Sequence, residues 1–273
     1  MTEEEFAFLK KKILKVTRIN LENYKSNQMR RRLDTFIVNA NFQNVASYCQ
    51  AMEQSPEMIN KLRDFLTINV SEFFRDSKYF QTLQEEILPI LLNKYGRLNI
   101  WSAGCSNGAE SYSIAIMLNE MSPNIRHRIL ATDIDERSLT KAVNGGPYRL
   151  EEIRNAPAQI LNKYFMQYED GYKTNEFMRS LITFKQHDML QEPFDKGYNL
   201  IVCRNVVIYF SVEAKNMLYQ RFHDSMKDDG VLFIGGTEAM LDASSLGFQM
   251  LRTCFYRKLT TRRDVLNMVA ATH

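Results

Sequence analysis

The sequence predicts an α/β protein in which helices cover both faces of a mainly parallel β-sheet, preceded by a small all-helical domain. Beyond residue 69, short apolar runs alternate with helical stretches, a pattern that favours a parallel sheet. Residues 2–66 show helical periodicity alone. One segment, 148–186, breaks the alternation and predicts an inserted β-hairpin subdomain.

The helical domain is expected to span residues 1–68. Thr2 and Glu5 have the spacing of a capping box, and apolar residues follow on one helical face. Further helices are indicated by the runs NYKSNQMRRRLDTFIV, NVASYCQAMEQ and SPEMINKLRDFLTI, which polar or proline-containing turns separate. Residues 69–90 are expected to form a linker and a first helix ahead of the second domain.

The second domain is expected over residues 91–259. Its strand candidates are LNIWSA (98–103), RILATD (128–133), LITFKQ (181–186), YNLIVC (198–203) and GVLFIGG (230–236). The run MLRTCFYRKL (250–259) follows without a long helix, so we expect a last strand that pairs antiparallel at the sheet edge. Within the insertion, Asp170-Gly171 lies between aromatic-rich runs, as in a tight hairpin turn. Residues 260–273 are expected to be a frayed tail.

Composition and charge limit the possible functions. The chain has 273 residues, of which 45% are hydrophobic, and its net charge of +3 demands no nucleic-acid partner. The four cysteines lie far apart without CxxC or Cys/His spacing, so we expect reduced thiols and no metal site. Neither a secretion signal nor an apolar run of about 18 residues occurs, which predicts a cytoplasmic protein without membrane insertion.

The residues that could carry chemistry follow the expected strands, where ligands bind to open parallel sheets. The first strand ends in a small-residue turn with Gly104 and Gly108, and Glu110 begins the next helix. Asp133 ends the second strand, where an acidic side chain commonly accepts hydrogen bonds from ribose hydroxyls. The later strand ends contribute Asp188, Met189, Arg204, Asn205 and Tyr209. Together these residues predict a nucleoside-binding pocket.

A phosphate cradle, a nucleophile elbow and a nucleoside pocket are the candidates for the glycine turn. The turn lacks GxGxxG and GxxxxGK, and Glu110 would repel a phosphate. The chain has no GxSxG, and its four histidines offer no convincing triad partner. S-adenosylmethionine has ribose hydroxyls, a sulfonium and an amino group but no phosphate, so an acidic pocket is complementary to it.

Four segments, TINVSEFFRD (67–76), IWSAGCSNGAESYSIA (100–115), ILATDID (129–135) and LIVCRNVVIYF (200–210), resemble the motifs of one family in order and spacing. This family is the CheR family of chemotaxis receptor methyltransferases, and the resemblance spans about residues 5–259. It implies a class I S-adenosylmethionine-dependent methyltransferase fold of Rossmann type. It also implies methyl esterification of glutamates in methyl-accepting chemotaxis receptors, with S-adenosylhomocysteine as the product.

The resemblance implies cofactor contacts from residues in the linker and at the strand ends. These residues are Asn69, Ser71, Arg75, Glu110, Asp133, Asp188, Met189, Arg204 and Asn205. Glu110 would bind the amino end of the methionine and Asp133 the ribose. Residues 188–189 would lie near the adenine, and residues 204–205 would close the pocket near the sulfonium.

Three positions of the glycine turn depart from the family pattern, which reads close to CSTGEEPYS. Asn107, Ala109 and Ser111 replace its Thr, first Glu and Pro. Because Glu110 is retained, we expect cofactor affinity to be altered at most.

The implied reaction needs no general base, because a glutamate with an ordinary pKa near 4.3 is already ionised at neutral pH. The enzyme has to align the carboxylate oxygen with the methyl group and exclude water. Arg75 and Tyr209 are the catalytic candidates for orienting the substrate carboxylate, although Arg75 could equally serve the carboxylate of the cofactor.

A basic segment near the amino terminus suggests a partner site. The resemblance implies that Lys25, Arg30, Arg31 and Arg32 dock on acidic cytoplasmic helices of the receptors, whereas a solvated face is the alternative. The insertion lacks the glycine-containing loop with which some family members bind a receptor pentapeptide, so it resembles the peptide-independent branch. We expect a monomer. Two other functions stay open: methylation of another protein or a small molecule, and cofactor sensing without catalysis.

Overall fold

The protein is described by a computed structural model over residues 1–67, 71–240 and 242–259. The chain divides into two compact units, Met1–Ile68 with Tyr209–Met217, and Asn69–Ile208 with Leu218–His273. The start of the predicted linker and the predicted tail over 260–273 lie outside the described residues. In the described residues, no helix is long and apolar enough to cross a membrane.

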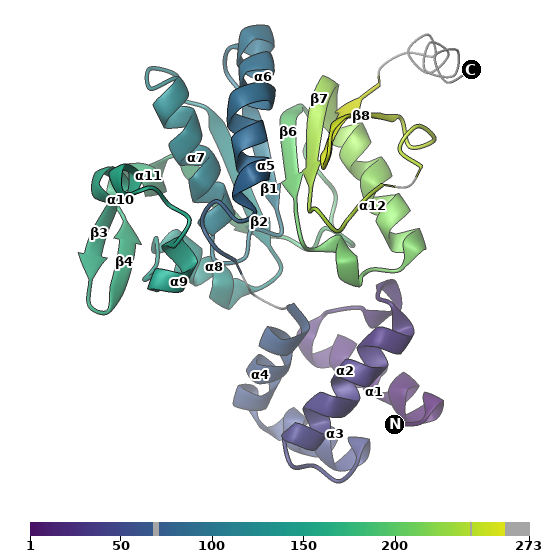
Figure 1. Cartoon of the computed structure of the whole chain (residues 1–273). Coiled ribbons are helices and arrows are strands. Elements are labelled where there is room, and N and C mark those ends of the chain that lie inside the picture. The colour runs from purple at the N-terminus through teal and green to yellow at the C-terminus, as the bar shows by residue number, and fades with distance from the viewer. Residues whose placement is uncertain (68–70, 241, 260–273) are drawn as a thin grey trace. The chain divides into compact units, whose positions relative to one another are not determined.

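The first unit is helical, and Figure 1 draws its residues 1–67 in purple and blue. Its elements are α1 (Glu3–Thr17), η1 (Leu21–Asn23), α2 (Ser26–Asn39), α3 (Val45–Gln54) and α4 (Pro56–Thr67). The predicted capping box is confirmed, since the Glu5 N–H donates to Thr2 Oγ1 at 3.2 Å and the Thr2 N–H donates to Glu5 Oε2 at 2.7 Å. The most deeply buried core side chains are Leu9, Ile13, Leu33, Met52 and Leu62.

The segment Tyr209–Met217 belongs to this helical unit although it follows a strand of the sheet in sequence. The Lys25 N–H donates to the Tyr209 carbonyl at 3.0 Å, and the Ser211 N–H donates to the Asn23 carbonyl at 2.8 Å. The rings of Tyr24 and Phe210 meet edge to face at 5.2 Å. The helical core is therefore completed by residues distant in sequence.

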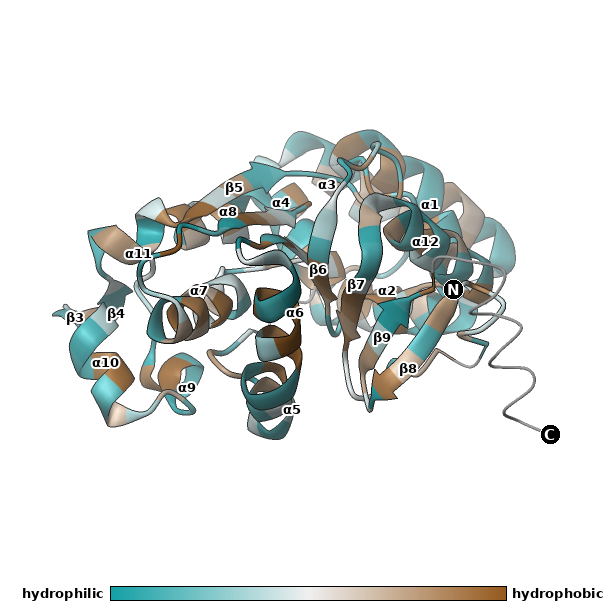
Figure 2. Ribbon diagram, turned by 90° about the horizontal axis from the view of Figure 1, so that it is seen from above, coloured by the Kyte–Doolittle hydropathy of each residue, from teal (hydrophilic) through white to brown (hydrophobic). Residues whose placement is uncertain are grey.

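The second unit is built on a seven-stranded sheet in the order β5-β2-β1-β6-β7-β9-β8 (Figure 1). The strands are β1 (Asn99–Ala103), β2 (Arg128–Asp133), β5 (Ile182–Gln186), β6 (Tyr198–Cys203), β7 (Met226–Ile234), β8 (Phe248–Arg252) and β9 (Phe255–Lys258). The first five of these are mutually parallel, as predicted. Figure 2 colours much of β6 and β7 as hydrophobic, in agreement with the burial of β6 along its whole length.

The predicted antiparallel pairing of residues 250–259 at the sheet edge is confirmed, but the prediction of a single strand is wrong, because this run contributes to two strands. β9 pairs antiparallel with β7 and with β8, and the chain reverses between Arg252 and Phe255. Cys254 in that turn has a positive φ of 74°. The turn is hidden in the sequence because it contains neither glycine, proline nor asparagine.

Helices cover both faces of the sheet, as predicted. α5 (Ser77–Thr82), η2 (Leu83–Ile87) and α6 (Leu88–Tyr95) precede β1, α7 (Ala109–Met121) follows β1, and α8 (Glu136–Val143) follows β2. η3 (Val207–Tyr209) and α12 (Val212–Ser225) follow β6. Figure 2 shows α6 and α7 on one face of the sheet and α12 on the other.

The predicted β-hairpin of the insertion is confirmed, but its loop lies one residue earlier than expected. The insertion contains α9 (Leu150–Ile153), α10 (Ala158–Tyr164), β3 (Phe165–Tyr168), β4 (Gly171–Thr174) and α11 (Glu176–Ser180). Tyr168 pairs with Gly171, so the two loop residues are Glu169 and Asp170. A Cβ on Gly171 would lie 2.6 Å from the Tyr148 carbonyl oxygen. This glycine therefore allows β4 to approach Tyr148 and is not a turn residue.

Candidate active site

The glycine turn between β1 and α7 is packed tightly at the carboxyl end of β1. Gly104 and Gly108 have φ values of 79° and 85°, a left-handed conformation that favours glycine. A Cβ on Gly104 would lie 2.6 Å from a methyl group of Val206, and one on Gly108 would lie 2.8 Å from the Ala142 Cβ. The turn thus lies between the loop that follows β6 and helix α8.

Glu110 and Arg204 face each other beside this turn. Glu110 Oε1 accepts a hydrogen bond from Ser102 Oγ at 2.9 Å, and Glu110 Oε2 lies 3.5 Å from Arg204 Nη1. Burial raises the pKa of Glu110, and the charge of Arg204 opposes that shift. Arg204 Nη2 also donates to Asp76 Oδ2 at 2.7 Å and to the Arg75 carbonyl at 3.1 Å. The structure therefore brings residue 75, Glu110 and Arg204 to one place.

The guanidinium of Arg204 is held between aromatic rings. Its carbon lies 4.7 Å from the centre of the Phe233 ring and 5.3 Å from that of Phe80. Only 5% of Arg204 is exposed, and its Nε has no hydrogen-bond partner among the described residues. The Oγ of Ser106 in the glycine turn is likewise buried without a described partner. Unsatisfied polar atoms thus remain at this strand end.

Asp133 joins the end of β2 to the glycine turn. Its Oδ2 accepts the Ser106 N–H at 2.7 Å, and its Oδ1 accepts the Asp135 N–H at 2.9 Å. Burial raises the pKa of Asp133 to about 6. Each carboxylate oxygen can accept a second hydrogen bond, so acceptor sites remain for hydroxyl donors.

The predicted adenine neighbours occupy the turn after β5. Asp188 Oδ1 accepts the Leu190 N–H at 2.8 Å, which closes this turn. The methyl group of Met189 lies 3.6 Å from the position of a Cβ on Gly104. Met189 is therefore brought to the glycine turn, whereas the carboxylate of Asp188 serves its own turn.

Glu238 is a site residue that the sequence analysis missed. It is 2% exposed, and its carboxylate accepts the N–H groups of Gly235 at 2.7 Å, Asn205 at 2.8 Å and Ile208 at 3.3 Å. Burial raises the pKa of this carboxyl group. Asn205 itself has a positive φ of 60°, so Glu238 stabilises the strained loop after β6. Its place just after Gly235-Gly236 at a strand end was the signal that could have identified it.

The remaining predicted residues are distributed between the two units. Asn69 lies outside the described residues. The Ser71 carbonyl lies 3.4 Å from Asn107 Nδ2, and the Arg75 side chain is half-buried. Tyr209 belongs to the helical unit, where the guanidinium of Arg32 lies over its ring.

The predicted receptor-binding residues have different environments within the helical unit. Lys25 and Arg31 are exposed, and Arg30 forms an ion pair with Glu3. Arg32 Nη2 donates to the Phe65 carbonyl at 2.8 Å, and burial lowers its pKa.

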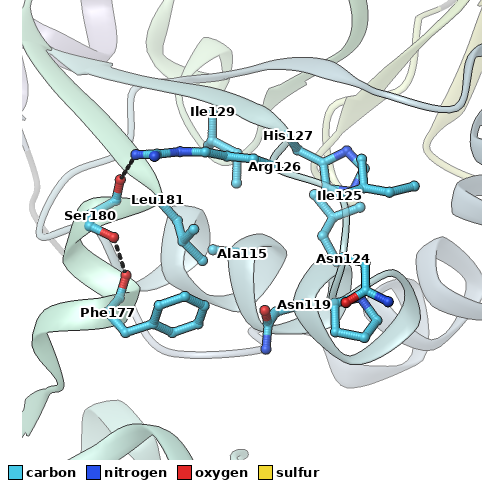
Figure 3. Close-up of a pocket in the computed structure, with 12 residues that line it drawn as sticks. Ala115, Asn119, Asn124, Ile125, Arg126, His127, Ile129, Phe177, Ser180 and Leu181 are labelled. Atoms are coloured by element: carbon cyan, nitrogen blue, oxygen red, sulfur yellow. Dashed lines mark hydrogen bonds between the residues drawn. The ribbon is translucent and has the colours of Figure 1, made fainter.

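A separate cavity of about 360 Å³ lies near the amino end of β2 (Figure 3). Leu118 of α7, Ile125 and Ile129 line it together with Phe177 and Leu181 from the insertion. The described residues that line it include none that we predicted to bind the cofactor. Among the residues that the structure describes, no group of three or more His, Cys, Asp and Glu could hold a metal ion.

Comparisons with known proteins agree with the resemblance in sequence. Residues 69–255 match the family described as "CheR methyltransferase, SAM binding domain", and residues 4–67 match "CheR methyltransferase, all-alpha domain". The chain is 36% identical over 258 residues to a chemotaxis protein methyltransferase of Listeria innocua, covering 94% of this chain and 98% of that protein. It is 35% identical over 272 residues to that of Borreliella burgdorferi, covering 94% and 95%.

The residues at the strand ends fit S-adenosylmethionine. The mostly buried carboxylate of Glu110 and the buried carboxylate of Asp133 suit an ammonium group and ribose hydroxyls. The unsatisfied Arg204 Nε and Ser106 Oγ offer further polar contacts. The glycine turn that carries them lies within the matched SAM-binding domain. The chain therefore belongs to the CheR family of S-adenosylmethionine-dependent methyltransferases.

Proposed function

We propose that this protein transfers the methyl group of S-adenosylmethionine to glutamate side chains of chemotaxis receptors. The observation that carries the proposal is the pairing of Glu110 with the buried Arg204 beside the glycine turn, in a chain that matches both domains of the CheR family. The family relationship supports the receptor as the substrate, and the pair supports an amino-acid end of the cofactor at this position.

Each end of the pocket has a role in this proposal. Ionised Glu110 binds the ammonium group of the cofactor, and the nearby charge of Arg204 favours that ionised form. Arg204 Nε binds the carboxylate of the same amino-acid end, and Asp133 binds the ribose hydroxyls. When bound, S-adenosylmethionine supplies a methyl group activated by the positive sulfur atom.

The side chains in the pocket are suited to transfer without a covalent enzyme intermediate. Burial raises the pKa of the Cys105 and Cys203 thiols well above the usual range, so both stay protonated and are poor nucleophiles. The substrate carboxylate is ionised already and attacks without a general base. We assign its orientation to Arg75 and Tyr209, and this alignment could lower the barrier by about 7–11 kcal/mol at most.

The receptor is proposed to bind through its acidic cytoplasmic helical region. The exposed side chains of Lys25 and Arg31 on the helical unit support this docking. Electrostatic docking would make association sensitive to salt. We further propose that the protein acts in the cytoplasm as a monomer and requires no metal.

The test is incubation of the protein with labelled S-adenosylmethionine and receptor-containing membranes, followed by mild base. Label released as volatile methanol identifies a glutamate methyl ester and supports the proposal. Label on the receptors that resists base would point to methylation of nitrogen and would contradict it. A protein that binds S-adenosylhomocysteine but transfers no label would instead be a cofactor-sensing module.

A further inference from the structure

Glu152 on α9 contacts two segments that we assign to cofactor binding. Its Oε1 accepts a hydrogen bond from Asn107 Nδ2 in the glycine turn at 2.6 Å. Its backbone carbonyl accepts the Phe73 N–H at 2.7 Å, in the segment that holds Ser71 and Arg75. One residue of the insertion thus lies between both cofactor segments.

The amide of Asn107 has a defined orientation because it is bonded at both ends. Its Oδ1 accepts the Ala109 N–H at 3.1 Å at the start of α7, while its Nδ2 donates to Glu152 and lies 3.4 Å from the Ser71 carbonyl. A reversed amide would direct Oδ1 at the carboxylate of Glu152 and would lose these bonds. Threonine, which the family pattern has at this position, carries a single hydroxyl and could not make the same set of contacts.

The carboxylate of Glu152 is paired with a lysine of α8 and with a backbone N–H of the insertion. Lys141 Nζ lies 2.7 Å from Oε1 and 2.9 Å from Oε2, and the Arg149 N–H donates to Oε2 at 2.8 Å. The bond that Asn107 donates to this carboxylate is charge-assisted, and only 6% of Asn107 is exposed. Such a bond is stronger than one between neutral groups.

Neighbouring side chains also restrict the movement of Phe73 and Asn107, the two residues that Glu152 contacts. Phe73 is fully buried and packs edge to face on Tyr148 at 4.9 Å between ring centres. The hydroxyl of Tyr148 donates to the Asn107 carbonyl at 2.8 Å. Asn155 Nδ2 donates to the Phe73 carbonyl at 3.3 Å. The glycine turn, residues 71–75 of the linker and α9 therefore form one packed cluster.

We propose that Glu152 is a positioning residue for cofactor binding, which acts through Asn107. By fixing the amide of Asn107 and the backbone of Phe73, it holds the glycine turn and residues 71–75 in the arrangement that receives S-adenosylmethionine. The inference rests on the proposed use of the glycine turn as the cofactor site. It makes the insertion, which lies outside the sheet, a contributor to cofactor affinity.

The primary test is calorimetric binding of S-adenosylhomocysteine to Glu152→Gln, which keeps the shape of the side chain and removes its charge. We expect a dissociation constant about tenfold higher than that of the native chain, the effect of losing a hydrogen bond to a charged group. In a methylation assay, the KM for S-adenosylmethionine should rise while kcat at saturation changes less than about twofold.

The matched control is Glu120→Gln. Glu120 accepts a hydrogen bond from Lys163 Nζ at 2.7 Å, so this variant also loses a lysine partner in the same unit, but at a distance from the glycine turn in sequence and bonding. Equal weakening by both variants would indicate a general loss of stability and would overturn the inference.

A second pair of variants tests the bond itself. Asn107→Asp keeps the acceptor for the Ala109 N–H but places a carboxylate against Glu152, and it should weaken binding more than Glu152→Gln does. Adding Glu152→Gln to Asn107→Asp restores a donor opposite the carboxylate and should recover part of the affinity. Failure of this recovery would overturn the inference.

Glu110→Gln separates this inference from the proposed cofactor site. If Glu110→Gln weakens binding and Glu152→Gln leaves it within about twofold, the inference alone is wrong. If Glu110→Gln has no effect, the glycine turn is not the cofactor site, and both the inference and the proposed function fail.

Discussion

The guanidinium carbon of Arg32 lies 5.5 Å from the centre of the Tyr209 ring inside the helical unit. The same guanidinium lies 4.8 Å from the Phe65 ring and donates to the Phe65 carbonyl. Arg32 is thus a packing residue that joins α2, α4 and the segment after β6. Among the four basic residues predicted to bind receptors, Lys25 and Arg31 are exposed.

We therefore expect the double variant Lys25→Ala/Arg31→Ala to reduce receptor methylation several-fold at low salt, with a smaller effect at high salt. Thermal stability should change by less than about 0.5 kcal/mol, because both side chains are on the surface. Arg32→Ala should instead cost about 1–3 kcal/mol through lost packing and hydrogen bonding. Methylation assays at two salt concentrations and calorimetric melting check both statements. Unchanged methylation in the double variant would exclude the docking role.

Glu110→Gln should weaken binding of S-adenosylmethionine by about 10- to 100-fold, because the ammonium group loses a charged partner. The variant should be no less stable than the native chain at neutral pH. Burial raises the pKa of Glu110, which means that its charged form is disfavoured in the fold. Calorimetric titration and thermal melting measure the two effects. A loss of stability parallel to the loss of affinity would contradict the expectation.

Cofactor binding should weaken as the pH falls through about 6, where Asp133 takes up a proton. A protonated carboxyl group has fewer acceptor sites for ribose hydroxyls, so the dissociation constant should rise by up to about tenfold per pH unit below that pKa. Titration with S-adenosylhomocysteine between pH 5 and 8 would show this change. Asp133→Asn should remove most of this pH dependence, and we would assign any pH dependence of binding that remains to Glu110.

The raised pKa of Asp133 affects folding in the opposite direction to cofactor binding: it favours the folded state at low pH. The pKa of Asp133 is raised from 3.8 to about 6 by burial, so the folded chain binds more protons than the unfolded chain between these values. Its contribution to stability therefore falls as the pH rises from about 4 to 6.

Glu238→Gln should destabilise the protein by about 1–3 kcal/mol. The carboxylate accepts three backbone N–H groups, whereas glutamine would direct an NH₂ group at one or more of them. Urea denaturation measures the loss. Glu85→Gln, at an exposed position, is the control and should have no effect. If Glu238→Gln were equally neutral, the loop after β6 would not depend on this carboxylate.

We expect no measurable affinity for a receptor carboxyl-terminal pentapeptide. The β3–β4 hairpin has a two-residue loop, Glu169–Asp170, and lacks the longer glycine-containing loop that the resemblance associates with peptide binding. Calorimetry with the peptide tests this expectation. Tight micromolar binding would show that the short hairpin suffices.

Local sequence patterns predicted the parallel strands, the capping box at Thr2 and the hairpin of the insertion, because each depends on residues close together in the chain. They also selected Glu110, Asp133 and Arg204, because strand ends gather at one edge of a parallel sheet. The relation of Glu152 to Asn107 was not predictable, since 45 residues separate them and only folding brings them together.

Other features were hidden for different physical reasons. Arg32 lies in a basic run that is typical of a solvated helix face, yet it is half-buried and its guanidinium lies over two aromatic rings. The reversal between β8 and β9 contains residues without a strong turn preference. Glu238 follows a strand end, as the other site residues do, but the backbone N–H groups that it binds belong to two loops that only folding brings together.

The participation of Tyr209–Met217 in the helical unit bears on how this protein can be dissected. The chain enters the helical core a second time after β6, and the Lys25–Tyr209 and Ser211–Asn23 bonds lie at this return. Residues 1–68 expressed alone would therefore lack Tyr209–Met217, and the surface that this segment covers would be exposed. A chimera that exchanges the helical unit between relatives would therefore have to exchange both stretches to keep its core intact.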